Sequence, residues 1–130
     1  MMRNTQLAVL ALALLALPAL ADDVSFKADL VPVLKTRCAT CHLTGEEGGN
    51  MALHPRAAYA SLVGVASIEA PMLQRVHPGK PEQSYLLLKL EGTHLDAGGN
   101  GVRMPFGEAP LDAAVIGKFR AWIAAGAADN

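Results

Sequence analysis

Two cysteines and a histidine stand together in the stretch RCATCHLTG, where two residues separate Cys38 from Cys41 and His42 follows at once. Four kinds of chemistry use cysteines at this spacing: a disulfide, half of a zinc site, a redox-active dithiol and the covalent attachment of haem. In the last case the two thiols add to the vinyl groups of haem, and the histidine ligates the iron. The remainder of the chain favours this case over the other three.

Each alternative to haem lacks a feature that it needs. A disulfide between Cys38 and Cys41 would close a loop with only two residues inside it, which constrains the unfolded chain little. A zinc finger needs a second histidine three to five residues after His54, whereas the next one is His77. A thioredoxin-type dithiol lies in a βαβ unit, and no strand is expected here. We therefore interpret the motif as a haem c attachment site with His42 as the proximal iron ligand.

Residues 1–21 have the layout of a secretory signal peptide. A short positive start is followed by an unbroken apolar run over residues 7–17, by Pro18 and by a small-x-small cleavage site. The run is far shorter than the roughly 20 residues that span a bilayer. We expect cleavage, export to the periplasm or another compartment outside the cytoplasm, and a mature domain of residues 22–130 without a membrane anchor. Haem c is attached outside the cytoplasm, so the signal and the motif agree.

The composition of the mature chain excludes one class of partner. Removal of Arg3 with the signal leaves ten Lys and Arg against twelve Asp and Glu, a net charge of −2. Nucleic-acid binding needs a basic footprint, which this balance does not supply. Large side chains are scarce, because the chain has only three Phe, two Tyr and one Trp. A bound apolar group would help to fill such a core.

Apolar periodicity predicts an all-α domain of three or four short helices joined by long loops, and no run alternates with period two. The helices are expected over residues 25–36, 56–63, 81–90 and 111–126. Asp29 is the predicted N-cap of the first helix. The last helix carries one apolar stripe, made of Val115, Phe119, Trp122 and Ile123. A glycine-rich loop over residues 93–107 precedes it, and loops of this length are typically functional or disordered.

That loop contains the preferred candidate for the second iron ligand. Met104 stands before Pro105 in GVRMPFG, and a residue before proline is restricted to extended backbone. Met104 follows His42 by 62 residues, which is enough chain to reach the opposite face of the haem. The other candidates are Met51, Met72, His54, His77 and His94. The ordinary role of a methionine is to fill the core, and a histidine in a loop is ordinarily exposed. An iron without a sixth ligand also stays possible.

The segments CATCH, RMPFG and FRAWIAAGA together resemble a class I monohaem cytochrome c domain. With RVHPGKPEQSYLLLKLEG, they are closer still to the planctomycete-type cytochrome c family, and the resemblance covers roughly residues 25–127. It implies a cytochrome c-like fold, with long loops wrapped around one covalently bound haem and the N-terminal helix crossing the C-terminal helix near Phe119 and Trp122. It also implies the site residues: Cys38 and Cys41 as thioether anchors, His42 as proximal ligand and Met104 as distal ligand.

A haem iron with histidine and methionine ligands implies electron transfer rather than catalysis. Both axial positions are filled, so the iron cycles between Fe(III) and Fe(II), and the thioether raises its potential. We therefore expect an exported electron carrier, not an enzyme, that meets redox partner proteins through small transient contacts. Two alternatives stay open: a haem-bearing electron-transfer subunit of a larger oxidoreductase complex, and a five-coordinate haem sensor or peroxidase.

Overall fold

The structure, a computed structural model, describes residues 23–130, so the predicted signal peptide of residues 1–21 lies outside the described residues. The regular structure of this part consists of α1 (Val31–Arg37), α2 (Ala58–Leu62), α3 (Tyr85–Glu91) and α4 (Ala113–Ala124). It also has a short π-helical segment, η1 (Phe26–Leu30), and a short 3-10 helix, η2 (Pro81–Gln83). Three isolated β-bridges occur between residues 63 and 84, and residues 23–130 form no strand. The prediction of an all-α domain with short helices is therefore confirmed. Among these helices, none has the length and apolarity needed to cross a bilayer.

The N-terminal helix begins earlier than the predicted cap implies. Ser25 is the N-cap, because its Oγ accepts a hydrogen bond from the Ala28 N–H at 3.1 Å. The Asp29 carboxylate accepts the Ser25 N–H at 3.0 Å in return. This reciprocal arrangement satisfies donors that the first turn leaves free. The prediction of Asp29 as the cap was wrong, and the helical segment runs from Phe26 through η1 and α1 to Arg37.

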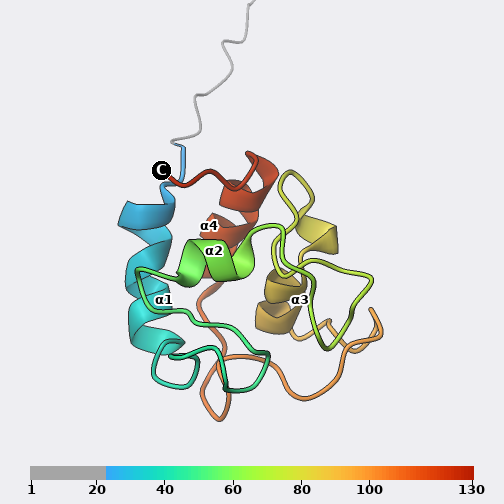
Figure 1. The fold of residues 1–130 in the computed structure, drawn as a ribbon. Helices are drawn as coiled ribbons and strands as arrows, with labels where there is room; N and C mark the ends of the chain where they lie inside the picture. Colours follow the sequence, from blue (N-terminus) through green and yellow to red (C-terminus); the bar gives the residue numbers. More distant parts are fainter. Residues whose placement is uncertain (1–22) are drawn as a thin grey trace, which may run out of the picture.

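The N-terminal helix packs against α4, as the resemblance implied. Phe26 stacks on Trp122 with ring centroids 4.9 Å apart, and Tyr59 from α2 meets Phe26 edge-on at 5.4 Å. Both Phe26 and Trp122 are buried. The Lys27 N–H donates to the Asn130 carbonyl at 2.9 Å, so the start and the end of the described chain lie side by side (Figure 1). One aromatic cluster thus joins three helices.

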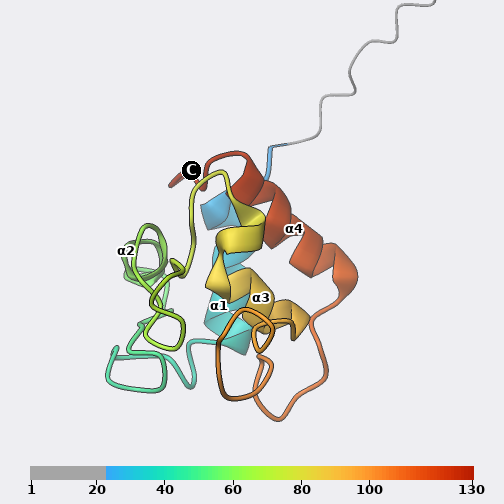
Figure 2. The same cartoon turned by 90° about the vertical axis from the view of Figure 1, so that its right-hand side faces the viewer.

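Helix α3 lies at the centre of the domain and is buried on every side. It packs against α4, and Figure 2 shows it between α2 and α4. Every residue from Tyr85 to Leu90 is buried, including the charged Lys89. Gly92 ends the helix in the left-handed conformation, with φ 80°. Glycine adopts that conformation without the steric cost that other residues incur.

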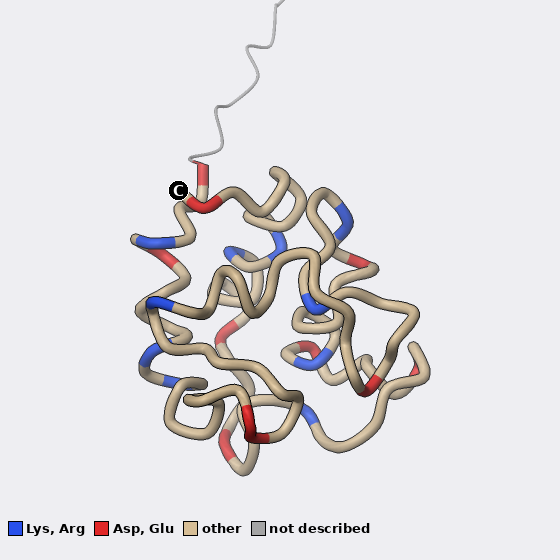
Figure 3. The backbone as a smooth tube through the Cα atoms, viewed as in Figure 1, with Lys and Arg blue, Asp and Glu red and all other residues tan. Residues whose placement is uncertain are grey.

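The long loops gather at the end of the molecule opposite the termini. The loop that follows the cysteine motif and the loop between α3 and α4 both lie there, in the two views of Figures 1 and 2. Figure 3 shows basic and acidic residues interspersed along the described backbone. The helices therefore act as a frame that presents two loops, one carrying His42 and the other Met104.

Candidate functional site

The chain leaves α1 and enters a tight turn that carries the cysteine motif. The N–H groups of Cys41 and His42 both donate to the Cys38 carbonyl, at 3.1 and 3.0 Å. The Leu53 N–H donates to the His42 carbonyl at 2.7 Å and ties the following loop back to the histidine. The two thiols are not joined by a disulfide; Cys38 is half-buried and Cys41 is exposed. The turn thus presents two free thiols beside one imidazole.

The environment of Cys38 differs from that of a redox-active cysteine. Burial raises the pKa of its thiol to about 11, so the thiol is neutral at pH 7. Redox-active cysteines are thiolates, with pKa values lowered by nearby positive charge. The raised pKa therefore does not favour the dithiol interpretation. Within residues 23–130, no three Cys, His, Asp or Glu side chains come together as metal ligands.

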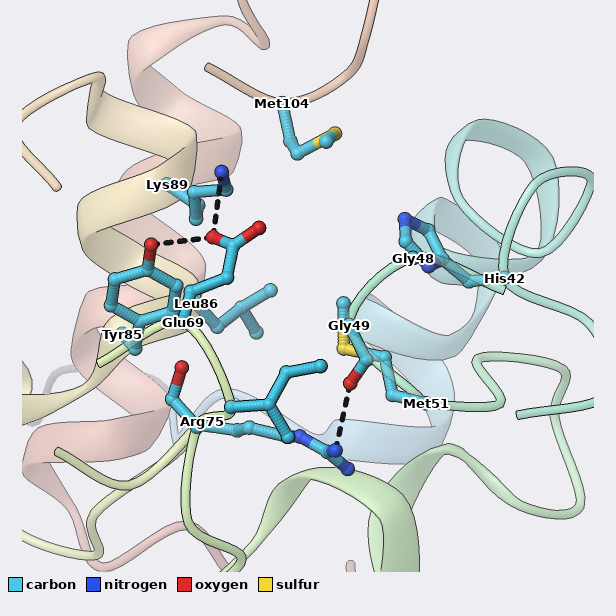
Figure 4. Close-up of a pocket in the computed structure, with 12 residues that line it drawn as sticks. His42, Gly48, Gly49, Met51, Glu69, Arg75, Tyr85, Leu86, Lys89 and Met104 are labelled. Carbon is cyan, nitrogen blue, oxygen red and sulfur yellow. Dashed lines mark hydrogen bonds and ion pairs between the residues drawn. The ribbon is translucent and has the colours of Figure 1, made fainter. Parts of the chain in front are cut away.

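His42 and Met104, 62 residues apart in the sequence, line the same cavity. Its volume is about 100 Å³, below the roughly 300–1,000 Å³ typical of small-molecule and cofactor sites. Figure 4 shows Met104 reaching from its loop toward the side on which His42 stands. Met51, the competing methionine, lines the cavity too.

The imidazole of His42 has an unsatisfied nitrogen. Its Nδ1 is buried and has no hydrogen-bond partner in the described part of the chain. Buried polar atoms are nearly always paired, so this unpaired nitrogen is an exception, on a ring that lines the cavity. An imidazole and a thioether on one cavity, with two free thiols next to the imidazole, form a donor set that fits haem c.

The other candidate ligands lie away from this cavity. Met72 is 96% exposed, and neither His54 nor His77 lines the cavity. Cys38 and Cys41 are not lining residues either, and they reach the cavity only through their position next to His42.

His94 does not match the expectation for a loop histidine. It is 2% exposed, and its ring meets the Tyr85 ring edge-on with centroids 6.3 Å apart. Its Nε2 lies 3.3 Å from the Gly101 carbonyl oxygen. The expectation of exposure was wrong because the loop folds back onto α3 and covers the ring.

A buried polar network, which sequence reasoning missed, forms part of the cavity wall (Figure 4). The Lys89 Nζ lies 2.9 Å from Glu69 Oε2, and the Tyr85 hydroxyl donates to the same oxygen at 2.6 Å. Burial and the neighbouring carboxylate raise the pKa of Tyr85 to about 12. Burial alone would raise the pKa of Glu69, but the hydrogen bonds from Tyr85 and Lys89 outweigh it and lower that pKa. Glu69 is therefore ionised at neutral pH. The only sequence signal was a lysine inside the apolar run LLLKL.

Arg75 fixes the wall on the histidine side. Its guanidinium donates to the carbonyl oxygens of Ser61 at 2.7 Å, Gly49 at 2.8 Å and Asn50 at 3.1 Å. Burial lowers the pKa of Arg75, but an arginine remains charged at neutral pH. One buried cation thus ties the loop that follows His42 to helix α2.

The chain was also compared with known proteins. No protein-family model, no curated protein and no solved structure matches it.

Proposed function

We propose that the protein is an exported monohaem c-type cytochrome of cytochrome c-like fold that carries single electrons between partner proteins. The observation that supports this most is that His42 and Met104 line one cavity. Imidazole and thioether are the axial ligands of cytochromes c. The turn at Cys38 and Cys41 adds two thiols next to the imidazole, which is what covalent attachment of haem requires.

The residues divide the work as follows. Bound haem c would supply a one-electron couple. Cys38 and Cys41 would tether it by thioether bonds, and His42 and Met104 would bind the iron from its two faces. Leu86 of α3 adds apolar wall to the same cavity. The protein's contribution would be to orient the group, restrict its contact with water and tune its potential.

A redox partner would approach where the cavity meets solvent. Ile68 lines the cavity and is 52% exposed, so it marks such a place. Electron-transfer partners associate through small and short-lived interfaces. The proposal therefore includes transient contacts with other redox proteins. It does not require a catalytic group on this chain.

Three methionine variants test the axial set. Met104→Ala, Met51→Ala and the exposed control Met72→Ala are each purified after export, and visible spectra are recorded oxidised and reduced, with and without carbon monoxide. We expect a six-coordinate spectrum that resists carbon monoxide in the wild type, Met51→Ala and Met72→Ala. Met104→Ala should lose the sixth ligand and bind carbon monoxide.

Four outcomes would change the proposal. A wild-type protein without haem overturns it. Loss of the sixth ligand in Met51→Ala instead of Met104→Ala moves the distal assignment to Met51. A wild-type protein that binds carbon monoxide readily supports the sensor or peroxidase alternative instead, whereas stable co-purification with another subunit supports the complex alternative.

A further inference from the structure

The position of Met104 depends on a long surface loop. Residues 93–103 connect α3 to Met104, and most of them are exposed. The Met104 N–H donates to the Lys89 carbonyl at 3.0 Å, which brings the loop back to the last turn of α3. An exposed loop of this length is mobile unless buried groups hold it. The groups that hold this loop therefore decide where the Met104 sulfur lies.

Lys89 holds the loop through its side chain as well as its main chain. It is 7% exposed, and its Nζ donates to the Asn100 carbonyl at 2.8 Å. The same Nζ lies 2.9 Å from Glu69 Oε2, so the lysine charge is paired. Lysine is almost never fully buried unless it is paired in this way. One residue of α3 thus contacts the loop at both Asn100 and Met104.

Tyr85 provides a second attachment one helical turn earlier. Its hydroxyl donates to Glu69 at 2.6 Å and accepts the Asn100 N–H at 3.4 Å. Gly99 lies against this hydroxyl: a Cβ at Gly99 would overlap it and come within 2.7 Å of the His94 carbonyl oxygen. The close approach explains why glycine is needed here. The loop is seated on the tyrosine and the lysine together.

We infer that Lys89, held by Glu69, is a positioning residue that keeps the loop of residues 93–103 seated on α3 so that Met104 faces His42 across the cavity. The inference rests on the proposed function. Burying a charged pair costs free energy that an apolar side chain at the same position would not incur. An apolar side chain at position 89 would, however, leave the Asn100 carbonyl without its hydrogen-bond donor. The loop would then lose its side-chain attachment to α3. The charge inside an otherwise apolar helix thus has a role in placing the distal ligand.

The test measures how firmly Met104 holds the oxidised iron. Exogenous imidazole competes with the methionine, so its affinity for the haem-loaded protein rises when Met104 is held less well. In Lys89→Met, hydrogen bonds to a charged group are lost, and we expect imidazole affinity to rise by about tenfold to a hundredfold. The absorption of the iron–thioether bond should weaken in the same protein. Lys35→Met is the control, because it removes the same positive charge from an exposed position. It should have the imidazole affinity of the wild type.

Loss of global stability is tested separately. Phe26→Leu alters the aromatic core beside the C-terminus, where the Phe26 N–H donates to Asn130 Oδ1. It should lower the urea midpoint without changing imidazole affinity.

Gly99→Ala serves as a second test of the loop, and as the main one if Lys89→Met does not fold. Its Cβ should displace the loop from Tyr85 and also raise imidazole affinity, while both members of the ion pair stay in place.

The inference is supported if Lys89→Met, or Gly99→Ala where Lys89→Met does not fold, raises imidazole affinity and Phe26→Leu does not. It is overturned if haem-loaded Lys89→Met keeps the wild-type affinity and thioether absorption, or if Lys89→Met does not fold and Gly99→Ala keeps them, in which case the proposed function still stands. It is also overturned if Phe26→Leu raises the affinity as much as they do. A wild-type chain that carries no haem overturns the proposed function itself.

Discussion

Replacing Arg75 by methionine should destabilise the domain without displacing its main chain. The guanidinium makes three hydrogen bonds, to the carbonyl oxygens of Ser61, Gly49 and Asn50. The main chain at Arg75 is held independently, because its N–H donates to the Val65 carbonyl at 2.7 Å. The substitution therefore removes the side-chain bonds and leaves the local fold in place.

The expected loss follows from those three bonds. A hydrogen bond to a charged group contributes about 1.5–3 kcal/mol, and removal of the buried cation also removes its desolvation cost. Water can replace the guanidinium at the exposed Asn50, but less readily at the half-buried Ser61 in the last turn of α2. We expect a net loss of about 2–4 kcal/mol, a large share of the roughly 5–15 kcal/mol that stabilises a domain.

Urea unfolding of the purified protein measures this loss. With a denaturant slope of about 2 kcal/mol/M, the middle of the usual range, the midpoint of Arg75→Met should fall by about 1–2 M. Arg56→Met is the matched control, because Arg56 is exposed and has no ion pair within residues 23–130. It should stay within about 0.5 kcal/mol of the wild type. A midpoint for Arg75→Met that equals that of Arg56→Met would refute the role assigned to the buried guanidinium.

Two further predictions concern the loop after the cysteines and the aromatic core. Backbone hydrogen bonds from Thr44 and Gly45 lower the pKa of Glu47 from 4.5 to about 2. Its contribution to stability is therefore complete above pH 4.5 and lost as the pH falls toward 2. The difference in unfolding free energy between wild type and Glu47→Gln should shrink over that range, and a difference independent of pH would contradict this. Trp122→Ala should cost about 3–5 kcal/mol, because the ring is buried against Phe26; a thermal midpoint close to that of the wild type would show that the stack contributes little.

The helices were predictable from sequence because their apolar spacing is local information. Phe119, Trp122 and Ile123 follow one stripe, and all three are buried in α4. The cap of the first helix was misassigned because Ser25 and Asp29 both accept helical N–H groups well, and sequence alone does not rank them. Only the geometry shows that Ser25 caps and Asp29 bonds back to it.

The cavity wall was predictable only in part. Spacing pointed to His42, and the loop context pointed to Met104, but their common cavity is a tertiary fact. Glu69 and Lys89 are 20 residues apart, and neither belongs to a motif. From sequence alone, an isolated glutamate such as Glu69 is predicted to be a solvated surface residue. Their pairing depends on the loop before α3 folding across that helix, which no local pattern encodes.

The central claim, that this chain is tethered to one haem, is tested most directly by the intact mass of the exported protein under denaturing conditions. We predict the mass of residues 22–130 plus one covalently bound haem, and loss of the added mass when Cys38 and Cys41 are both replaced by alanine. A wild-type mass equal to the polypeptide alone, in cells that mature other c-type cytochromes, would contradict the account.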